Sequence, residues 1–357
     1  MFGSDRSAVR LALLLARLGH EVNLAVPRAR PERGLMRLAA EHAVAVEPAP
    51  IEIVSSRGVS GIGGSIGRRP PSPAELTIYN TAAVARRYGD RRPRVLIVRE
   101  WLSPEWRRHR ALCRMHGRRL DGVVAVSRAV AERWRECARV TVPVDVCPNW
   151  LGEDWLSPEP SDEREGVLFL GRLNAWKGQL ALADAFERAF ERSGERPSLT
   201  FVGAEGRGTP FHRHAAELRR RSEGRGWRLL DFTPSPRKLL RRAALVVIPS
   251  LRPEPFGNVI LEGLASGARV IAFPGGGVDD LAPLFPASVE VVPRERDALA
   301  AALARWWREG AKPQSADEHD AVLETLHQHF SVEAVAPRWA AVIERLSQPS
   351  RARPRSA

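Results

Sequence analysis

The amino-acid sequence predicts an α/β protein made of two doubly wound domains. Short, continuously apolar segments alternate with helical patterns along most of the chain, which is typical of parallel strands covered by helices on both faces. The length of 357 residues is more than a single hydrophobic core usually holds. In open sheets of this kind, ligand sites lie at the carboxyl ends of the strands.

The predicted elements follow one another in regular order. In the first half of the chain the predicted strands are Val22–Val26, Val95–Val98, Val123–Val126 and Val144–Cys147. In the second half they are Val167–Leu170, Leu199–Val202, Leu245–Ile248, Arg269–Phe273 and Val289–Val292. Helices are predicted at Ser7–Leu18, at Ser127–Trp134 with Ser127 as the N-cap, at Leu180–Arg192 and at 331–346.

The pattern is interrupted near residues 150–165, where prolines and acidic residues gather. This predicts a first domain over 1–150 and a second over 151–330, followed by the helix 331–346. Residues 348–357 are rich in Pro, Arg and Ser and predict a disordered tail. The Gly-, Ser- and Arg-rich segment 55–73 predicts a mobile loop, which could face a substrate or have no role.

Positive charge is concentrated in the first half of the chain. The net charge is +13; residues 1–150 carry 26 Arg and Lys against 14 Asp and Glu, whereas residues 151–357 carry 29 against 28. One predicted helix of the first half is especially basic, with Arg107, Arg108, Arg110, Arg114, Arg118 and Arg119. Such a face could lie on an anionic membrane surface, meet an anionic substrate, or be an Arg-biased solvated surface. No known nucleic-acid-binding motif accompanies the charge, so no nucleic acid is expected as a partner.

Cysteine and histidine usage predicts no metal site. Cys113, Cys137 and Cys147 lack metal-ligand spacing, which indicates buried thiols in a reducing cytoplasm. The pairs His212/His214 and His327/His329 are two residues apart on predicted helices, so their side chains would point apart and are expected to be exposed. No apolar run has the length of a membrane span, so we expect a cytoplasmic protein that could associate with the inner face of a membrane.

Lysine is rare, and one of the three lysines lies in a glycine-flanked motif. The chain has Lys177, Lys238 and Lys312 against 52 arginines. Lys177 lies in Gly171-Arg172-Leu-Asn-Ala-Trp-Lys177-Gly178, directly after the predicted strand Val167–Leu170. A compact ammonium retained in so arginine-rich a chain indicates that its shape is needed there.

A second motif places two carboxylates around a predicted loop-to-helix junction. Glu254 is followed by Pro-Phe256-Gly257-Asn258-Val259, and Glu262 comes after seven intervening residues. Val-Ile-Pro-Ser precedes the motif and Gly275-Gly-Gly277 follows it. The first backbone N–H groups of a helix have no acceptor within it, so those of Gly257, Asn258 and Val259 could seat a phosphate. The two carboxylates could then meet hydroxyl groups on either side; the alternative is a surface loop with two solvated glutamates.

These motifs together resemble glycosyltransferase family 4, whose members are retaining nucleotide-sugar glycosyltransferases of the GT-B fold. The resemblance rests on the Glu-x7-Glu pair with its flanking Pro-Ser and Gly-Gly and on the Gly-Arg-x4-Lys-Gly motif. It runs from about residue 3 to about 346 and is densest over 167–281. It implies two Rossmann-like domains facing a central cleft, with the acceptor at domain 1–150 and the nucleotide sugar at domain 151–330. In this fold the final helix 331–346 crosses back onto the first domain.

The resemblance also implies roles for single residues. Arg172 and Lys177 would neutralise the leaving diphosphate, with no metal or other cofactor. Glu254 would orient the transferred sugar and Glu262 would accept the ribose hydroxyls. The remaining nucleotide-sugar-binding residues would be Gly3, Gly171, Gly203, Phe256, Gly257, Asn258 and Val259. Glycines 3 and 203 could equally be ordinary turn residues.

The chain departs from the family in two places. Many members carry a histidine after the strand that Val95–Val98 matches, but here the sequence is Arg99-Glu100-Trp101. Glu100 could act on the acceptor or sugar, Arg99 could meet a phosphate, or the two could form an ordinary pair. The family's glycine-rich turn, here Gly3-Ser4-Asp5, normally follows a first strand, but no strand precedes it here. We expect either that the true start of the chain lies upstream of Met1 or that the sheet of the N-terminal domain lacks this strand.

The predicted function is therefore transfer of a sugar from a nucleoside-diphosphate sugar to a hydroxyl of a saccharide or polyprenyl-linked saccharide acceptor. Retention of configuration and a place in cell-envelope or exopolysaccharide assembly are implied by the resemblance alone. Two alternatives remain: a GT-B sugar epimerase or phosphorylase, and a truncated or inactive glycosyltransferase-like binding module.

Overall fold

The computed structural model describes residues 3–27, 45–49, 51–55, 63–67, 76–80, 93–157, 164–191, 196–205, 208–233 and 235–347. The chain divides into two compact units. Unit 1 comprises Met1–Asn149 with Val332–Ala357, and unit 2 comprises Trp150–Ser331. The predicted tail 348–357 lies outside the described residues. The same is true of two arginine pairs of the basic first half, Arg86-Arg87 and Arg91-Arg92.

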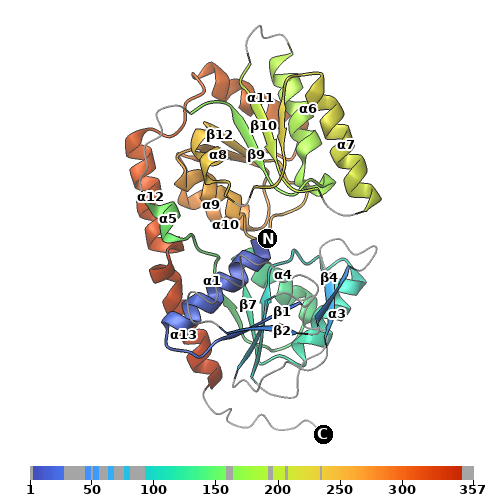
Figure 1. Ribbon diagram of the computed structural model, residues 1–357, viewed down its shortest axis with the longest axis vertical. Helices are drawn as coiled ribbons and strands as arrows, with labels where there is room; N and C mark the ends of the chain where they lie inside the picture. The colour runs from blue at the N-terminus through green and yellow to red at the C-terminus, as the bar shows by residue number, and fades with distance from the viewer. Residues whose placement is uncertain are drawn as a thin grey trace. The chain divides into compact units, whose positions relative to one another are not determined.

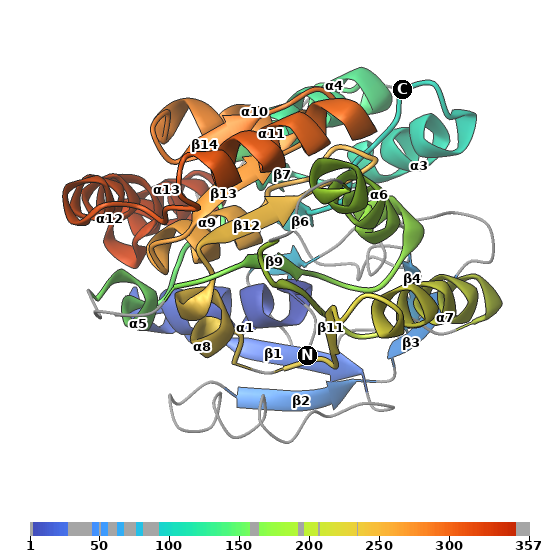
Figure 2. The same cartoon turned by 90° about the horizontal axis from the view of Figure 1, so that it is seen from above.

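Unit 2 is built on one six-stranded parallel sheet (Figures 1 and 2). The strands are β9 (Val167–Leu170), β10 (Leu199–Val202), β11 (Arg228–Leu230), β12 (Leu245–Ile248), β13 (Arg269–Ala272) and β14 (Val289–Val291). Their order is β11-β10-β9-β12-β13-β14, and every pairing is parallel. The chain therefore winds outward from β9 in one direction, then crosses over and winds outward from β12 in the other.

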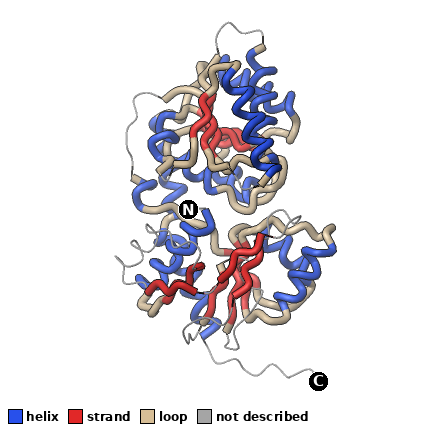
Figure 3. The backbone as a smooth tube through the Cα atoms, turned by 45° about the vertical axis from the view of Figure 1, so that its right-hand side comes forward, coloured by secondary structure: helices blue, strands red, loops and turns tan. Residues whose placement is uncertain are grey.

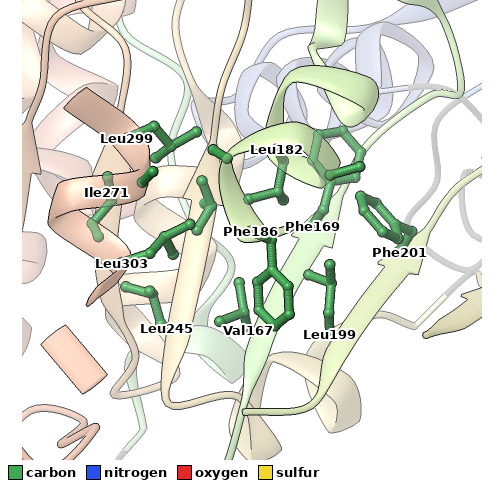
Figure 4. Close-up of a cluster of buried hydrophobic side chains, with 14 of the residues drawn as sticks. Val167, Phe169, Leu182, Phe186, Leu199, Phe201, Leu245, Ile271, Leu299 and Leu303 are labelled. Carbon is green, nitrogen blue, oxygen red and sulfur yellow. The ribbon is translucent and has the colours of Figure 1, made fainter. Parts of the chain in front are cut away.

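Helices cover both faces of this sheet. The helices of unit 2 are α5 (Glu153–Leu156), α6 (Gln179–Phe190), α7 (Thr209–Glu223), α8 (Arg237–Arg242), α9 (Asn258–Ala265), α10 (Gly277–Leu281), α11 (Arg296–Arg308) and α12 (Ala316–Phe330), with short 3-10 turns η1 (Ala175–Lys177) and η2 (Ala282–Leu284). On one face, Leu182 and Phe186 of α6 lie over Val167 and Phe169, and Leu299 of α11 lies nearby in the same cluster (Figure 4). On the other face, α9 packs against β12 and β13, and α12 packs against α9.

Unit 1 has a smaller parallel sheet and two strand pairs (Figure 3). The sheet is β5 (Thr77–Tyr79), β6 (Arg94–Val98), β7 (Gly122–Ala125) and β8 (Val144–Val146), in that order. β1 (Asn23–Pro27) pairs in parallel with β2 (Ala45–Ala49), and β3 (Ile51–Ser55) pairs antiparallel with β4 (Gly63–Gly67). The helices are α1 (Gly3–Arg17), α3 (Arg107–Gly117), α4 (Arg128–Ala138) and α13 (Val332–Ser347). α13 belongs to unit 1, where its Arg345 forms an ion pair with Asp145 of β8.

The predicted fold class is confirmed, because both units are Rossmann-like α/β structures with parallel sheets. One prediction within it is wrong. Residues 63–67, which were expected to be part of a mobile loop, form strand β4. The reason is that β4 consists mostly of glycine and serine and so has no strand pattern of its own. Its partner β3 does have one, because the alternation Ile51-Glu-Ile53 is typical of a strand. The rest of that predicted loop, apart from Ser55 in β3, lies outside the described residues.

Candidate functional site

The candidate site lies where the strand order of unit 2 reverses. β9 and β12 are neighbours in the sheet, but β10, which follows β9, and β13, which follows β12, lie on opposite sides of this pair. The loops after β9 and β12 therefore turn in opposite directions, and open α/β sheets bind ligands in the crevice between two such loops. The motif Gly171–Gly178 follows β9, and the motif that contains Glu254 follows β12. The two motifs found in the sequence thus meet at the expected edge of the sheet.

A cation and a carboxylate from these two loops are in direct contact. The Lys177 Nζ lies 2.6 Å from Glu254 Oε1 and 2.9 Å from Oε2. The side chain of Glu254 is 8% exposed and that of Lys177 22%, so the pair is largely removed from water. The buried Ser250 hydroxyl also donates to Glu254 Oε1. Lys177 further lies 4.3 Å from the centroid of the Trp176 ring. The sequence did not predict that Lys177 and Glu254 contact each other.

Close backbone packing brings Lys177 to this position. Gly178 has a φ of +79°, and a Cβ built on it would lie 1.8 Å from the carbonyl oxygen of Pro249. Only glycine can therefore bring this loop so near the end of β12. The Leu251 N–H donates to the Trp176 carbonyl at 2.7 Å and joins the same two loops. The Asn174 side chain accepts the Lys177 N–H at 3.1 Å and caps the turn η1.

The backbone of Glu254 is fixed by the loop that follows β13. Glu254 and Gly276 form an isolated parallel bridge, and the Gly277 N–H donates to the Glu254 carbonyl at 2.7 Å. Gly276 has a φ of +73°, and a Cβ on it would lie 2.0 Å from that carbonyl oxygen. Arg294, which follows β14, donates to the Ser250 carbonyl at 3.2 Å and also to the Pro274 carbonyl. Arg294 thereby links the loops after three neighbouring strands, a role that the sequence did not predict.

The N-terminus of α9 follows Glu254 directly. Gly257 is its N-cap, with a φ of +100°, and Asn258 and Val259 begin the helix. Phe256 is buried and its ring centroid lies 6.2 Å from that of Phe330. Glu262 is half-buried on the second turn of the helix. The first N–H groups of α9 have no acceptor within the helix, so an anion at this end would be favoured by them and by the helix dipole.

Arg172 is an exposed residue of the loop after β9, and a buried polar pair fixes its backbone. The Gln179 Nε2 donates to the Arg172 carbonyl at 2.8 Å, and the Gln179 Oε1 lies 2.9 Å from His214 Nε2. An amide oxygen only accepts, so His214 carries its proton on Nε2 and donates. Burial lowers the pKa of His214, which favours this neutral form. The expectation that His214 is exposed is therefore wrong: α7 presents it to Gln179 on the buried face.

The two remaining glycines lie at the ends of neighbouring strands. The Gly171 N–H donates to the Val202 carbonyl at 2.9 Å, and the Gly203 N–H donates to the Leu230 carbonyl at 3.1 Å. Both glycines thus extend the sheet by one residue at its carboxyl edge, beside Arg172.

Two predicted site residues, Gly3 and Glu100, belong to unit 1 and not to the strand ends of unit 2. Gly3 begins α1. The Glu100 carboxylate accepts the backbone N–H of Arg99 at 3.0 Å. The Arg99 guanidinium donates from Nε to Asn80 Oδ1 at 3.0 Å and from Nη1 to Asn149 Oδ1 at 2.5 Å. Burial lowers the pKa of Arg99 to about 10, although the nearby Glu100 acts in the opposite direction.

Helix α3 presents the basic face that the sequence predicted. Arg107, Arg108, Arg114 and Arg118 are exposed, together with Trp106 and Met115, which are 43% and 39% exposed. His109, Cys113 and His116 lie on the opposite side of the helix and are buried. We call the exposed residues Trp106, Arg107, Arg108, Arg114, Met115 and Arg118 the α3 basic face.

All three cysteines are buried and free, as predicted. Among the described residues, no three His, Cys, Asp or Glu side chains come together in a way that could hold a metal ion. None of the described helices has the length and hydropathy needed to cross a membrane.

Comparison with known proteins agrees with this geometry. Residues 164–309, from the start of β9 to the end of α11, match the family model described as "Glycosyl transferases group 1". No curated protein sequence matches the chain significantly. Among solved structures, Anabaena Alr3699/HepE in complex with UDP and glucose is 20% identical, with a TM-score of 0.74 over 97% of this chain and 96% of that one.

Two further structures cover nearly the whole chain. A glycosyltransferase from Rickettsia africae is 16% identical with a TM-score of 0.68, over 97% of this chain and 95% of that one. Sucrose-phosphate synthase from Thermosynechococcus elongatus is also 16% identical with a TM-score of 0.68, over 94% and 92%. The chain has the GT-B fold. With the group 1 domain in residues 164–309, these findings support a GT-B glycosyltransferase.

Proposed function

We propose that this protein transfers a hexose from a nucleoside-diphosphate sugar to a hydroxyl group of a saccharide or lipid-linked saccharide, with retention of configuration. The observation that carries the proposal is the contact of Lys177 with Glu254 at the reversal of the strand order. A diphosphate is bound by cations, and the hydroxyl groups of a sugar are bound by hydrogen-bond acceptors. At this edge of the sheet Lys177 is the cation and Glu254 the acceptor, and the two are in direct contact. UDP-glucose is the first donor to test, because Alr3699/HepE has been solved with it.

The cationic side of the site would act on the leaving group. Transfer breaks the bond between the sugar C1 and the diphosphate oxygen, and the nucleoside diphosphate leaves with the bonding electrons. Lys177, Arg172 and the N-terminus of α9 would stabilise the negative charge that develops on those oxygens. These groups are held in place before the substrate arrives, so little reorganisation is needed during the reaction. No cofactor enters this scheme.

The acidic side of the site would hold the sugar and the ribose. When the diphosphate takes Lys177 as its partner, the Glu254 carboxylate is released to accept the hydroxyl groups of the transferred hexose. Ser250 would keep the carboxylate oriented through its hydrogen bond. Glu262, on the second turn of α9, would accept the ribose hydroxyls. The acceptor hydroxyl attacks C1 from the face that the diphosphate leaves, and its proton passes to an oxygen of the departing diphosphate as the new glycosidic bond forms.

An acceptor assay with UDP-glucose tests this function. We expect glucose to appear on an added saccharide acceptor, with UDP released in equal amount. Proton NMR of the product should show the anomeric configuration of the donor. An epimerase or phosphorylase would convert the donor without any saccharide acceptor, so conversion in its absence would contradict the proposal. A binding module would be stabilised by UDP but would never turn over, and this outcome would also contradict it.

The α3 basic face bears on the location of the acceptor. The α3 basic face combines arginines with the exposed Trp106 and Met115, a composition suited to an anionic membrane surface. A lipid-linked acceptor would be presented at such a surface. We therefore propose a peripheral contact with the inner face of a membrane, as expected of an enzyme of cell-envelope or exopolysaccharide assembly.

A further inference from the structure

The carboxyl edge of the unit 1 sheet holds a cation that forms no direct salt bridge with a described carboxylate. Arg99 follows β6 directly and is half-buried. Its Nε and Nη1 donate to the side-chain oxygens of Asn80 and Asn149, both of which are neutral amides. In the part of the chain that the structure describes, no Asp or Glu oxygen forms a salt bridge with this guanidinium. The carboxylate of Glu100 accepts the backbone N–H of Arg99 instead.

The amides come from the ends of other strands of the same sheet. Asn80 follows β5, which neighbours β6, and Asn149 lies three residues after the end of β8. The guanidinium is thus fixed between two anchors at the edge where parallel α/β sheets bind ligands. Because Nε and Nη1 are engaged, the orientation of the planar group is set, and its Nη2 forms no hydrogen bond with the described residues and can meet a ligand.

The start of α4 adds to the positive potential at this edge. The Val126 N–H donates to the Val98 carbonyl at 3.4 Å, so the loop before α4 runs beside the residue that precedes Arg99. Ser127 caps α4 through the Val130 N–H, at 3.1 Å. The other N–H groups of the first turn have no acceptor within the helix. The end of β6 and the start of α4 therefore both favour a negative charge.

Burial of a charge away from water is unfavourable, and burial lowers the pKa of Arg99 although the nearby Glu100 carboxylate raises it. The group nonetheless stays charged at neutral pH, because its pKa of about 10 is well above 7. A bound anion would give the guanidinium a direct anionic partner and form charge-assisted hydrogen bonds, which are among the strongest in proteins.

We propose that Arg99, oriented by Asn80 and Asn149, is a specificity-determining residue that binds an anionic group, a carboxylate or a phosphate, of the sugar acceptor. The identification of the bound anion as part of the sugar acceptor rests on the proposed transferase function, but the anion site itself does not depend on it. The acceptor class is then an acidic saccharide, such as a uronic acid or a sugar phosphate.

Binding of small probes to the full chain tests the site. Glucuronate and glucose 6-phosphate would each be compared with neutral glucose by isothermal titration, and inorganic phosphate would be titrated alone. We expect at least one of the two charged sugars to bind at least about tenfold more tightly than glucose. The Arg99→Gln variant should lose this preference, whereas Arg135→Gln, which removes the same charge from an exposed position of α4, should keep it. A preference that survives in Arg99→Gln, or is absent from the wild type, would overturn the proposal.

A second variant keeps the test decisive if Arg99→Gln does not fold. Asn149→Asp places a carboxylate against the guanidinium with almost no change of shape. We expect it to raise the melting temperature and to abolish the preference for charged sugars, since the counter-charge is then built in. A merely structural Arg99 would leave charged-sugar binding unchanged in this variant. UDP binding, measured on the same samples, separates the two proposals: its absence from the wild type would contradict the proposed function and leave the anion site standing.

Discussion

At the scale of single residues, the contact between Lys177 and Glu254 is the feature from which the chemistry follows. The two residues are 77 positions apart, yet the ammonium bridges both oxygens of the carboxylate. The pair is largely removed from water. Electrostatic interactions are stronger in such a place than at the surface. A diphosphate that enters this site has to compete with Glu254 for Lys177. Donor binding and reorganisation of the pair are therefore coupled.

Replacing Lys177 should slow transfer strongly. We expect Lys177→Gln to lower kcat/KM by about 10²- to 10³-fold, the usual cost of removing one group that stabilises charge in a transition state. Steady-state assays with UDP-glucose measure this effect. Lys238→Gln is the matched control, because Lys238 is exposed on α8 and should be replaceable without loss. Equal activity of the two variants would show that Lys177 does not act on the leaving group.

Replacing Glu254 should separate binding of the nucleotide from transfer of the sugar. In Glu254→Gln, Lys177 loses its counter-ion, so we expect UDP to bind more tightly than in the wild type. Transfer should fall by about 10²-fold or more, because the neutral amide cannot orient the hexose hydroxyls as a carboxylate does. Isothermal titration with UDP and a transfer assay provide the two readouts. Weaker UDP binding would contradict the competition described above.

At the scale of elements, the sequence predicted those whose pattern is local. Strands β9, β10 and β12 begin and end where their apolar runs do, and the N-cap Ser127 marked the start of α4. Edge strands β5 and β11, of three residues each, were missed, whereas the equally short β8 and β14 were predicted. Strand β4 was missed because its glycines resemble a loop.

The candidate site was predictable only in part, for a related reason. Glycine-flanked motifs identified Lys177, Arg172 and Glu254 as candidates, and the strand order places their loops together. Nothing local indicated the roles of Gln179, His214 or Arg294, since each acts through a partner that is distant in the sequence. Ser250 was noted only as part of the Pro-Ser before the motif, although its partner Glu254 is four residues away. Gln179 and His214 in particular lie on helix faces where an apolar side chain would fit the pattern equally well.

The α3 basic face leads to a prediction at the same scale. We expect the triple variant Arg107→Gln, Arg108→Gln and Arg114→Gln to bind anionic vesicles about 10²-fold more weakly, at roughly 1 kcal/mol for each arginine near the surface. Co-sedimentation with vesicles that contain phosphatidylserine measures the loss, with phosphatidylcholine vesicles as the control. The fold should be unaffected, because all three side chains are exposed. Unchanged sedimentation would exclude this face as the membrane contact.

At the scale of the whole molecule, the chain has two units with separate hydrophobic cores, and each unit buries histidines. Burial lowers the pKa of His109 in unit 1 and of His214 and His319 in unit 2. An unfolded histidine takes up a proton near pH 6.5, whereas these three do so at lower pH in the folded state. Below about pH 6.5 the unfolded chain therefore binds more protons, and stability falls as the pH falls.

Unfolding in urea at several pH values between 8 and 5 tests this account. The free energy of unfolding should be nearly constant above pH 7 and should decrease towards pH 5. His214→Gln should be less stable than the wild type at pH 8, because its hydrogen bond to Gln179 is altered, but its stability should depend less on pH. Parallel curves for the two proteins would show that His214 is not buried in its neutral form.

The central claim is that unit 2 binds a nucleotide sugar with Lys177 on the diphosphate and Glu254 on the hexose. A crystal structure of the protein with UDP-glucose tests it most directly. We predict that the Lys177 ammonium leaves the Glu254 carboxylate for a diphosphate oxygen at the start of α9, while Glu254 accepts hydrogen bonds from the glucose hydroxyls. A donor bound elsewhere, with the contact between Lys177 and Glu254 intact, would contradict the account.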